Sequence, residues 1–189
     1  MKNKLRLIVL AGALIFVAGK GMADSENKSY FGIQYAVGDF SEEAISKSFN
    51  PTALIGRFGY YYRPNISIEA RLGVGIEDDT QFLTELGVSG LDASLELDSI
   101  IGVYARGHIN LTESSSLYGV LGFSRIEATT SIPAFPEASS TSDETSVSYG
   151  IGADIAISGS GALNIEYILY LDKDNLDLGV ASVGATFAF

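Results

Sequence analysis

Three residue types that often organise a fold or a site are absent or scarce in this sequence. The 189 residues contain no cysteine, no tryptophan and a single histidine, His108. Without cysteine the chain can form neither a disulfide nor a lipid-modified N-terminal cysteine, so packing and hydrogen bonding must stabilise it. One histidine cannot supply paired imidazole ligands for a metal ion. The composition therefore excludes a disulfide scaffold and disfavours a histidine metal centre.

Long apolar runs are also missing, except at the N-terminus. Residues 1–23 join a basic start to the apolar run 7–19 and end with the small residues Gly21 and Ala23, which is the pattern of a secretory signal peptide. The alternative is a membrane-anchoring helix, but this run of 13 residues is short of the roughly 20 that a bilayer requires. We predict a signal peptide over residues 1–23, export through the inner membrane, and one domain over residues 24–189.

Basic residues are scarce in that domain. After residue 23, eight Lys and Arg remain against 23 Asp and Glu, so the net charge is −15. Phosphate backbones would repel such a chain, which excludes nucleic acid as a partner. No second apolar run is long enough for a membrane helix. If the domain enters a membrane, it must cross with strands.

Alternation of apolar and polar residues recurs along the whole domain. This period of two is typical of half-buried strands, and no amphipathic helical pattern is visible. Each alternating segment is long enough for a tilted crossing of a bilayer, which needs roughly 9–11 residues. The predicted strands are residues 29–40, 52–62, 66–77, 91–108, 116–128, 146–157, 162–172 and 176–189.

The predicted connections differ in length at the two ends. Short turns are expected at 63–65, 108–115 and 158–161, and the other end carries the longer links 41–51, 78–90 and 129–145 with a short one at 173–175. Short turns opposite longer loops are typical of an up-and-down barrel in the outer membrane. We therefore predict an all-β fold, an eight-stranded antiparallel up-and-down transmembrane β-barrel in the cell outer membrane of a Gram-negative bacterium.

Aromatic side chains concentrate near the predicted strand ends. Rings at both rims form the girdles found at membrane interfaces. The alternative is a soluble, lipocalin-like barrel, which would put the apolar residues inside and the charges in water. The residues that we assign to the girdle at the short-turn end are Tyr30, Phe31, Tyr60, Tyr62 and Tyr118.

The last strand supports the membrane interpretation. Residues 178–189 read LGVASVGATFAF, with apolar residues at every second position up to Phe187 and Phe189. Because hydrocarbon offers no partner to backbone polar groups, the sheet must close. We therefore expect the last strand to pair with the first, with Phe189 in the aromatic rim.

This ending, the signal peptide, the eight strands and the hairpin GRFGYYYRPNISIEARLGVG at 56–75 resemble the small OmpA-like and OmpX-like outer-membrane barrel family. The resemblance covers residues 24–189. It implies that Phe187 and Phe189 form a C-terminal signature read by the barrel-assembly machinery. It also implies that outer-membrane lipid and lipopolysaccharide surround the barrel. We expect no periplasmic peptidoglycan-binding domain after the last strand, so the anchoring role of OmpA is not implied.

The parity of the final phenylalanines assigns the two faces of the other strands. It turns apolar residues to lipid, including Leu95 and Leu97, and leaves the facing of the fifth strand, with Arg125, open. Eight strands enclose a lumen that side chains fill, and buried ions must be paired. We predict a closed lumen plugged by ion pairs, the alternative being a proton or ion path through the same residues. The inward charges near the short-turn rim are Arg57, Glu69, Arg71, Arg106, Asp154 and Glu166.

Signals for catalysis or cofactors are weak. Outer-membrane lipid A deacylases and palmitoyl transferases use a histidine with a serine, and no serine stands two residues after His108. We therefore interpret His108 as a rim or turn residue and predict neither an enzyme nor a cofactor. Residues 77–79 are all acidic, so a calcium site is one hypothesis for this segment, but the sequence lacks the spacing of an EF-hand.

The long loops are the remaining candidates for function. The link 129–145 is rich in serine and threonine, and Glu127, Glu137, Asp143 and Glu144 make its surroundings acidic. Such loops are either mobile and solvated or recognise an unknown extracellular ligand. The predicted function is an envelope structural protein or surface-binding scaffold. The alternatives are a narrow or gated porin for small solutes and, less favoured, a lipid A-modifying enzyme.

Overall fold

The computed structural model describes residues 28–42, 48–82, 92–132, 135–173 and 176–189. The predicted signal peptide, residues 1–23, lies outside the described residues. Within the described part of the chain, no helix is both long and apolar enough to cross a membrane.

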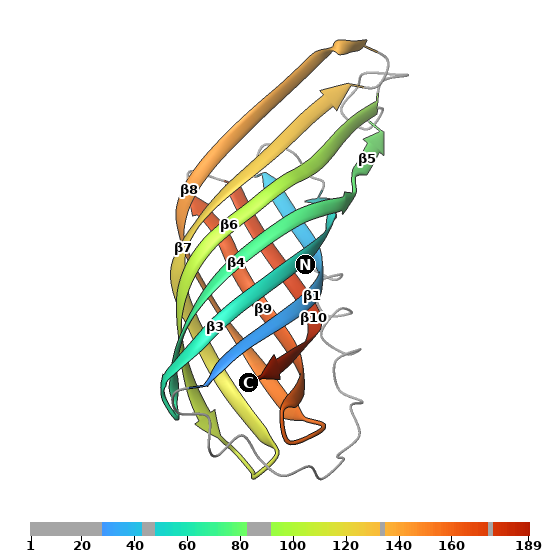
Figure 1. Ribbon diagram of the computed structural model, residues 1–189. Coiled ribbons are helices and arrows are strands. Elements are labelled where there is room, and N and C mark those ends of the chain that lie inside the picture. Colours follow the sequence, from blue (N-terminus) through green and yellow to red (C-terminus); the bar gives the residue numbers. More distant parts are fainter. Residues whose placement is uncertain (1–27, 43–47, 83–91, 133–134, 174–175) are drawn as a thin grey trace.

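Ten strands form one sheet in the described chain (Figure 1). Eight are long and match the predicted segments, and the short strands β2 (Ser48–Phe49) and β5 (Asp79–Phe82) lie at the long-loop end. The long strands are β1 (Ser29–Glu42), β3 (Thr52–Arg63), β4 (Ile66–Glu77), β6 (Asp92–Asn110), β7 (Ser115–Ile132), β8 (Phe135–Ala156), β9 (Gly161–Lys173) and β10 (Leu176–Ala188).

The sheet closes between its first and last long strands. β10 pairs with β1 antiparallel from Tyr30 opposite Ala188 to Glu42 opposite Leu176. Two backbone hydrogen bonds between Ser29 and Phe189, of 3.1 and 2.8 Å, extend the seam to the last residue. Closure pairs the backbone groups that an open sheet would leave exposed to hydrocarbon. The predicted eight-stranded antiparallel barrel is confirmed.

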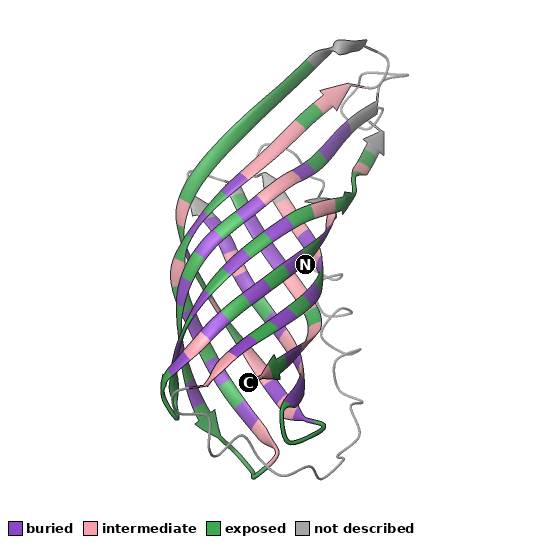
Figure 2. Cartoon of the chain, viewed as in Figure 1, coloured by how far each residue is buried: buried purple, intermediate pink, exposed green. Residues whose placement is uncertain are grey.

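Apolar side chains cover the outside of the barrel. Burial alternates residue by residue along β3 and β4, as the bands of Figure 2 show. Arg57 on β3 and Glu69 on β4, which their parity in the sequence places inward, are almost fully buried. This arrangement is the reverse of a soluble barrel, so the lipocalin-like alternative is wrong. Outward residues include Phe31, Ile33, Phe58, Ile68, Leu72, Val74, Ile101, Val103, Leu121, Phe123, Ile151 and Phe187.

The link predicted at 129–145 is a strand extension rather than a loop. β7 runs on to Ile132 and β8 begins at Phe135. The two strands pair regularly as far as Ser131 opposite Ser139, and the register then shifts so that Ile132 is opposite Phe135. Together with β5 and β6 they rise beyond the rest of the barrel (Figure 1). We call this part, residues 79–82, 92–98, 127–132 and 135–146, the outer sheet. The prediction failed because the two arms of this hairpin, residues 129–131 and 139–145, are polar on both faces, which removes the apolar alternation.

The facing predicted for Leu95 and Leu97 is also wrong. The register of β6 against β7 shifts between Leu97 and Ser99, so Asp98 is an extra residue in β6. Such a bulge reverses the faces of the residues on one side of it. Leu95 and Leu97 are therefore buried, whereas Ile101 on the other side of the bulge faces outward as predicted.

Candidate functional site

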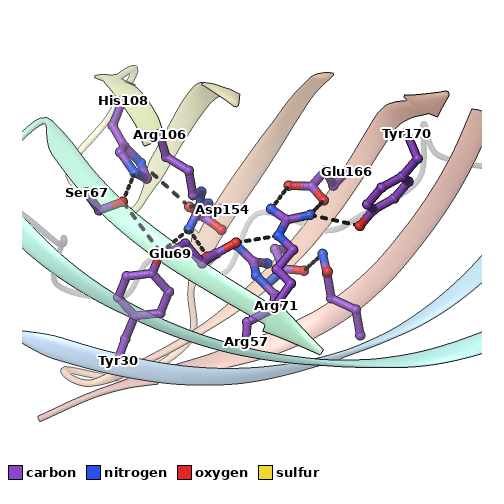
Figure 3. A network of polar contacts seen from close by, with 12 residues as sticks. Tyr30, Arg57, Ser67, Glu69, Arg71, Arg106, His108, Asp154, Glu166 and Tyr170 are labelled. Atoms are coloured by element: carbon purple, nitrogen blue, oxygen red, sulfur yellow. Dashed lines mark hydrogen bonds and ion pairs between the residues drawn. The ribbon is translucent and has the colours of Figure 1, made fainter. Parts of the chain in front are cut away.

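Glu69 lies at the centre of an ion-pair network inside the barrel (Figure 3). Its Oε2 accepts hydrogen bonds from Arg57 Nη2 at 2.6 Å, from the Tyr30 hydroxyl at 2.6 Å and from Arg106 Nη1 at 3.2 Å. Its Oε1 accepts one from Arg71 Nε at 2.6 Å. One carboxylate thus joins three guanidinium groups that come from β3, β4 and β6.

Arg71 carries the network from Glu69 across the lumen to β9. Its two terminal nitrogens donate to both carboxylate oxygens of Glu166, at 2.5 and 2.8 Å. This two-point geometry suits a guanidinium better than an ammonium group. The Arg71 guanidinium also lies 4.6 Å from the ring centre of Tyr104, which gives it a cation–π contact.

Arg106 carries the network toward the short-turn end. Its Nη2 donates to Asp154 Oδ2 at 3.1 Å, and its guanidinium lies 3.8 Å from the ring centre of Tyr118. Asp154 Oδ2 is 3.8 Å from His108 Nδ1, and His108 Nε2 is 3.4 Å from Ser67 Oγ. This part of the lumen therefore joins β4, β6, β7 and β8.

His108 lies near the short-turn rim, but in β6 rather than in a turn, and its side chain enters the lumen instead of staying at the surface. The ring packs at a tilt against Tyr61 and Tyr118, with ring centres 5.4 and 5.5 Å away. The nearby serine is Ser67 on β4, which no search for a serine two residues along the chain could find. Ser67 is fully buried and the distance from His108 to Asp154 exceeds the roughly 2.6–3.2 Å of an activated triad. The three residues therefore pack the lumen and are not aligned for attack.

The six charged residues predicted in the lumen all lie in this network. Three guanidiniums balance three carboxylates, and each of these side chains is almost fully buried. Removing one member of such a pair costs about 3–5 kcal/mol, because it leaves a buried charge without its partner. Among the described side chains, some buried polar atoms have no partner in the protein, including Arg57 Nε, Arg57 Nη1 and Asp154 Oδ1. Ordered water commonly satisfies groups of this kind.

Tyr30 and Tyr118 do not belong to the aromatic girdle. They are 1% and 3% exposed and line the lumen, where each lies against Arg106. Their rings cover glycines of neighbouring strands, since a Cβ on Gly59 would meet Tyr30 Cζ at 2.1 Å and one on Gly152 would meet Tyr118 Cζ at 2.3 Å. The prediction counted distance from the rim and overlooked that these tyrosines have inward parity.

The other aromatic residues predicted in the girdle, Phe31, Tyr60 and Tyr62, lie at the rim of the short-turn end. Phe31 stacks on Phe187 with ring centres 5.5 Å apart, and Phe189 lies 6.4 Å from Phe31. Phe58 stands opposite Phe31 on β3 and was missed by the prediction. Tyr62 is exposed and Tyr60 is half-buried. These rings lie on both sides of the seam between β1 and β10.

The lumen beyond the ionic network is apolar, which the sequence prediction missed. The adjacent residues Ile100 and Ile101 could have indicated an apolar lumen, because one of two adjacent strand residues must point inward. Tyr104 and Tyr170 join the two parts of the lumen, with their rings edge to face at 6.5 Å. The buried apolar cluster contains Ala36, Ala53, Ile55, Leu97, Ile100, Tyr104, Val120, Ile126, Ile168, Tyr170, Leu171, Leu178 and Val180.

The hairpin of β7 and β8 in the outer sheet is mostly polar, and its side chains pair with one another and with β6. Arg125, whose facing was open, points outward and binds Asp143 at 3.1 Å. Thr129 Oγ1 donates to Asp98 Oδ2 at 2.8 Å, and Thr129 also contacts Thr141 at 2.8 Å. In the acidic stretch 77–79, Asp78 Oδ2 accepts a hydrogen bond from Ser94 Oγ at 2.5 Å, and Asp79 Oδ2 accepts one from the backbone N–H of Asn50 at 2.8 Å. In the described ranges, no group of three or more acidic or histidine side chains could hold a metal ion.

A closed antiparallel barrel with apolar residues outside and charges inside is a membrane-spanning barrel of the bacterial outer-membrane type. The comparison with known families agrees with this class. The family described as outer membrane protein beta-barrel domain matches residues 8–189, and the chain belongs to it.

Solved structures with the same fold are small outer-membrane proteins. Ail, the attachment invasion locus protein of Yersinia pestis, is 21% identical with a TM-score of 0.61, over 87% of this chain and 99% of Ail. Neisserial surface protein A is 18% identical with a TM-score of 0.62, over 85% and 97%. OprG from Pseudomonas aeruginosa is 13% identical with a TM-score of 0.55, over 89% and 99%. A comparison with curated proteins found no match.

Proposed function

We propose that this protein is a non-enzymatic outer-membrane scaffold with a closed lumen, which binds an extracellular ligand through its outer sheet. The observation that carries the proposal is the projection of β7 and β8 beyond the apolar belt. The last large apolar residues on the outward face of this hairpin are Phe123 and Val147, and the strands continue past them as an exposed polar ribbon. Paired strands outside the bilayer hold their side chains in a fixed order on two faces, which an unpaired loop does not.

The packed lumen supports a scaffold over a pore. The ionic network lies in the short-turn half and the apolar cluster lies in the other half, with the hydrogen-bonded Ser124 and Ser148 beside Tyr104, so two layers of different chemistry stand in the path of a solute. Opening a path through the ionic layer would separate buried charges, at a cost of several kcal/mol for each pair broken.

The surroundings of the barrel follow from its apolar belt and its ending. We propose that the protein is exported by the signal peptide 1–23, is inserted by the barrel-assembly machinery through Phe187 and Phe189, and lies among outer-membrane lipid and lipopolysaccharide. Phe187 and Phe189 are both exposed on the outer surface, where an assembly factor can reach them.

A solved complex of a structural neighbour gives a useful contrast for the ligand. Ail has been crystallised with sucrose octasulfate, a heparin analogue. The exposed carboxylates of the outer sheet in this chain, including Glu96, Asp143 and Glu144, would repel a sulfated polyanion. We therefore propose that this protein does not bind ligands of that charge.

Adhesion of cells that produce the protein tests the binding role. The parent is compared with a trimmed variant in which an Asn-Gly turn joins Ile126 to Glu144, which are paired neighbours on β7 and β8. We expect both proteins to show the heat-dependent gel shift of a folded barrel, and only the parent to increase adhesion to host-cell layers or matrix proteins. Equal adhesion by the two variants would contradict the proposal, as would a parent no more adhesive than empty cells.

A narrow or gated pore is the second candidate. It is favoured by the buried polar atoms without protein partners, such as Arg57 Nη1 and Asp154 Oδ1, which water in the lumen would satisfy. Single-channel recording of the refolded protein in planar bilayers distinguishes the two functions. The scaffold predicts a silent parent. Reproducible channels whose conductance changes in Glu69→Ala or Arg71→Ala would establish the pore.

A further inference from the structure

The outer sheet ends in an open strand edge. β8 pairs with β7 along its length, but it pairs with β9 only from Tyr149 to Ala156. From Phe135 to Val147, no strand of the described chain pairs with the other side of β8, and the hairpin projects past β9 in Figure 1. An open edge presents backbone amide and carbonyl groups that can accept a further strand.

The side chains along this edge are polar and acidic on both faces. Residues 139–145 of β8 are all exposed. Asp143 and Glu144 are adjacent, so they lie on opposite faces of the strand. Glu127 on β7 is directly opposite Asp143 and shares its face. A strand that added to β8 would therefore run beside a carboxylate whichever face its own side chains occupied.

Among the side chains that the structure describes at the long-loop end, Arg125 is the one cation that offsets these charges, and Lys173 ends β9 at the same end of the barrel. Arg125 lies 3.1 Å from Asp143, and both side chains are more than half exposed. The acidic residues described at this end are Asp39, Glu77, Asp78, Asp79, Glu96, Asp98, Glu127, Asp143, Glu144 and Asp177. The ionic network of the lumen is balanced, so it does not neutralise this end. The local potential around the edge is therefore negative.

The charge decides between the possible occupants of the edge. A second copy of this chain would bring another Asp143 and Glu144 to an edge that is already acidic, and like charges that come close across a strand pair are destabilising. An apolar segment would find no apolar side chain among residues 139–145. A segment with lysine or arginine gains attraction on either face.

Resting on the binding role proposed above, we infer that the open edge of β8 accepts an extended, lysine- or arginine-bearing segment of another protein. The backbone of that segment pairs with residues 139–146, and its cationic side chains lie beside Glu127, Asp143 and Glu144. Backbone pairing supplies affinity that depends little on sequence, and the carboxylates select the charge of the partner.

Binding of synthetic peptides to the mature protein in lipid nanodiscs tests this inference. The probe is a fluorescent peptide of repeating threonine and lysine, measured by anisotropy at low and high salt. Its charge control repeats threonine and glutamate. Its backbone control is the same lysine peptide with alternate amides N-methylated, which keeps the charge and prevents strand addition. We expect the lysine peptide to bind, high salt to weaken it, and neither control to bind comparably.

Substitutions on the protein sharpen the test in both directions. Asp143→Asn combined with Glu144→Gln is expected to weaken the lysine peptide about tenfold, at about threefold for each exposed carboxylate. Arg125→Gln removes the competing cation and is expected to strengthen binding about threefold. The matched control is Glu113→Gln, which removes one exposed carboxylate at the short-turn end and is expected to change nothing.

The results separate this inference from the binding role itself. Equal binding of the lysine and glutamate peptides, or of the N-methylated peptide, would overturn the inference even if trimming the hairpin abolished adhesion. Self-association that the trimmed variant lost would also overturn it, in favour of a second copy as the occupant. If the lysine peptide binds as described but trimming the hairpin does not change adhesion, the edge is a docking site for cationic segments and the adhesive role is wrong.

Discussion

Two ion pairs of equal length lie in two very different regions of this barrel. Arg106 and Asp154 in the lumen are 3.1 Å apart, and so are Arg125, at the base of the outer sheet, and Asp143 within it. The first two side chains are 1% and 2% exposed, and the second two are 60% and 54% exposed. Distance therefore does not rank these interactions. Burial ranks them, because bulk water and salt screen the outer pair far more than the buried inner one.

Removing a carboxylate from each pair should give the largest difference. Asp154→Ala is expected to lower the free energy of unfolding by about 3–5 kcal/mol, because Arg106 loses a buried partner. Denaturant titration of the refolded protein, followed by circular dichroism, measures this change. The matched control, Asp143→Ala, is expected to change stability by less than about 0.5 kcal/mol. Similar losses in both variants would show that the lumen is hydrated enough to screen its charges.

The apolar part of the lumen extends the same comparison to neighbouring residues. Ile100 is fully buried and Ile101 is 52% exposed on the outer face. Ile100→Ala is expected to cost about 2–4 kcal/mol through lost contacts and a cavity. Ile101→Ala leaves only a smaller side chain in lipid and is expected to cost less than about 1 kcal/mol. Equal losses of stability for the two variants in a lipid bilayer would indicate that the apolar part of the lumen is not packed.

The tyrosines that lie over glycines offer an intermediate effect. Gly152→Ala would place a Cβ 2.3 Å from Tyr118 Cζ, so the ring that contacts Arg106 must move. We expect a loss of about 1–3 kcal/mol, the usual cost of overpacking. The control is Gly119→Ala on the outward face, where a Cβ would meet nothing within 4 Å. A tolerated Gly152→Ala would mean that Tyr118 is free to leave Arg106.

The smallest expected effect is the coupling within the outer pair. A double-mutant cycle with Arg125→Gln and Asp143→Asn should give less than about 1 kcal/mol, and salt should reduce it further. Unfolding of the four proteins at low and high salt measures the coupling. A salt-independent coupling as large as that of a buried pair would show that the outer sheet is shielded from water.

The closed fold and the lumen charges could be predicted because a barrel wall has a strict period of two. In β4, Ile68 and Leu72 point to lipid while Glu69 and Arg71 point inward, as their positions in the sequence require. A membrane forbids exceptions to this rule in its hydrocarbon layer, since an outward charge or an unpaired strand would be costly there. The sequence by itself therefore determined the number of long strands, the outer face of the barrel wall and the six lumen charges.

Features outside that layer depended on the tertiary structure. The polar hairpin 129–145 has no apolar side to show its pairing, and the bulge at Asp98 turned Leu95 and Leu97 inward. The meeting of Ser67 with His108 joins two strands through their register, which the spacing of residues along the chain does not contain. Alternation sets which face a residue takes. Only the register of the closed sheet decides which residues from different strands stand together.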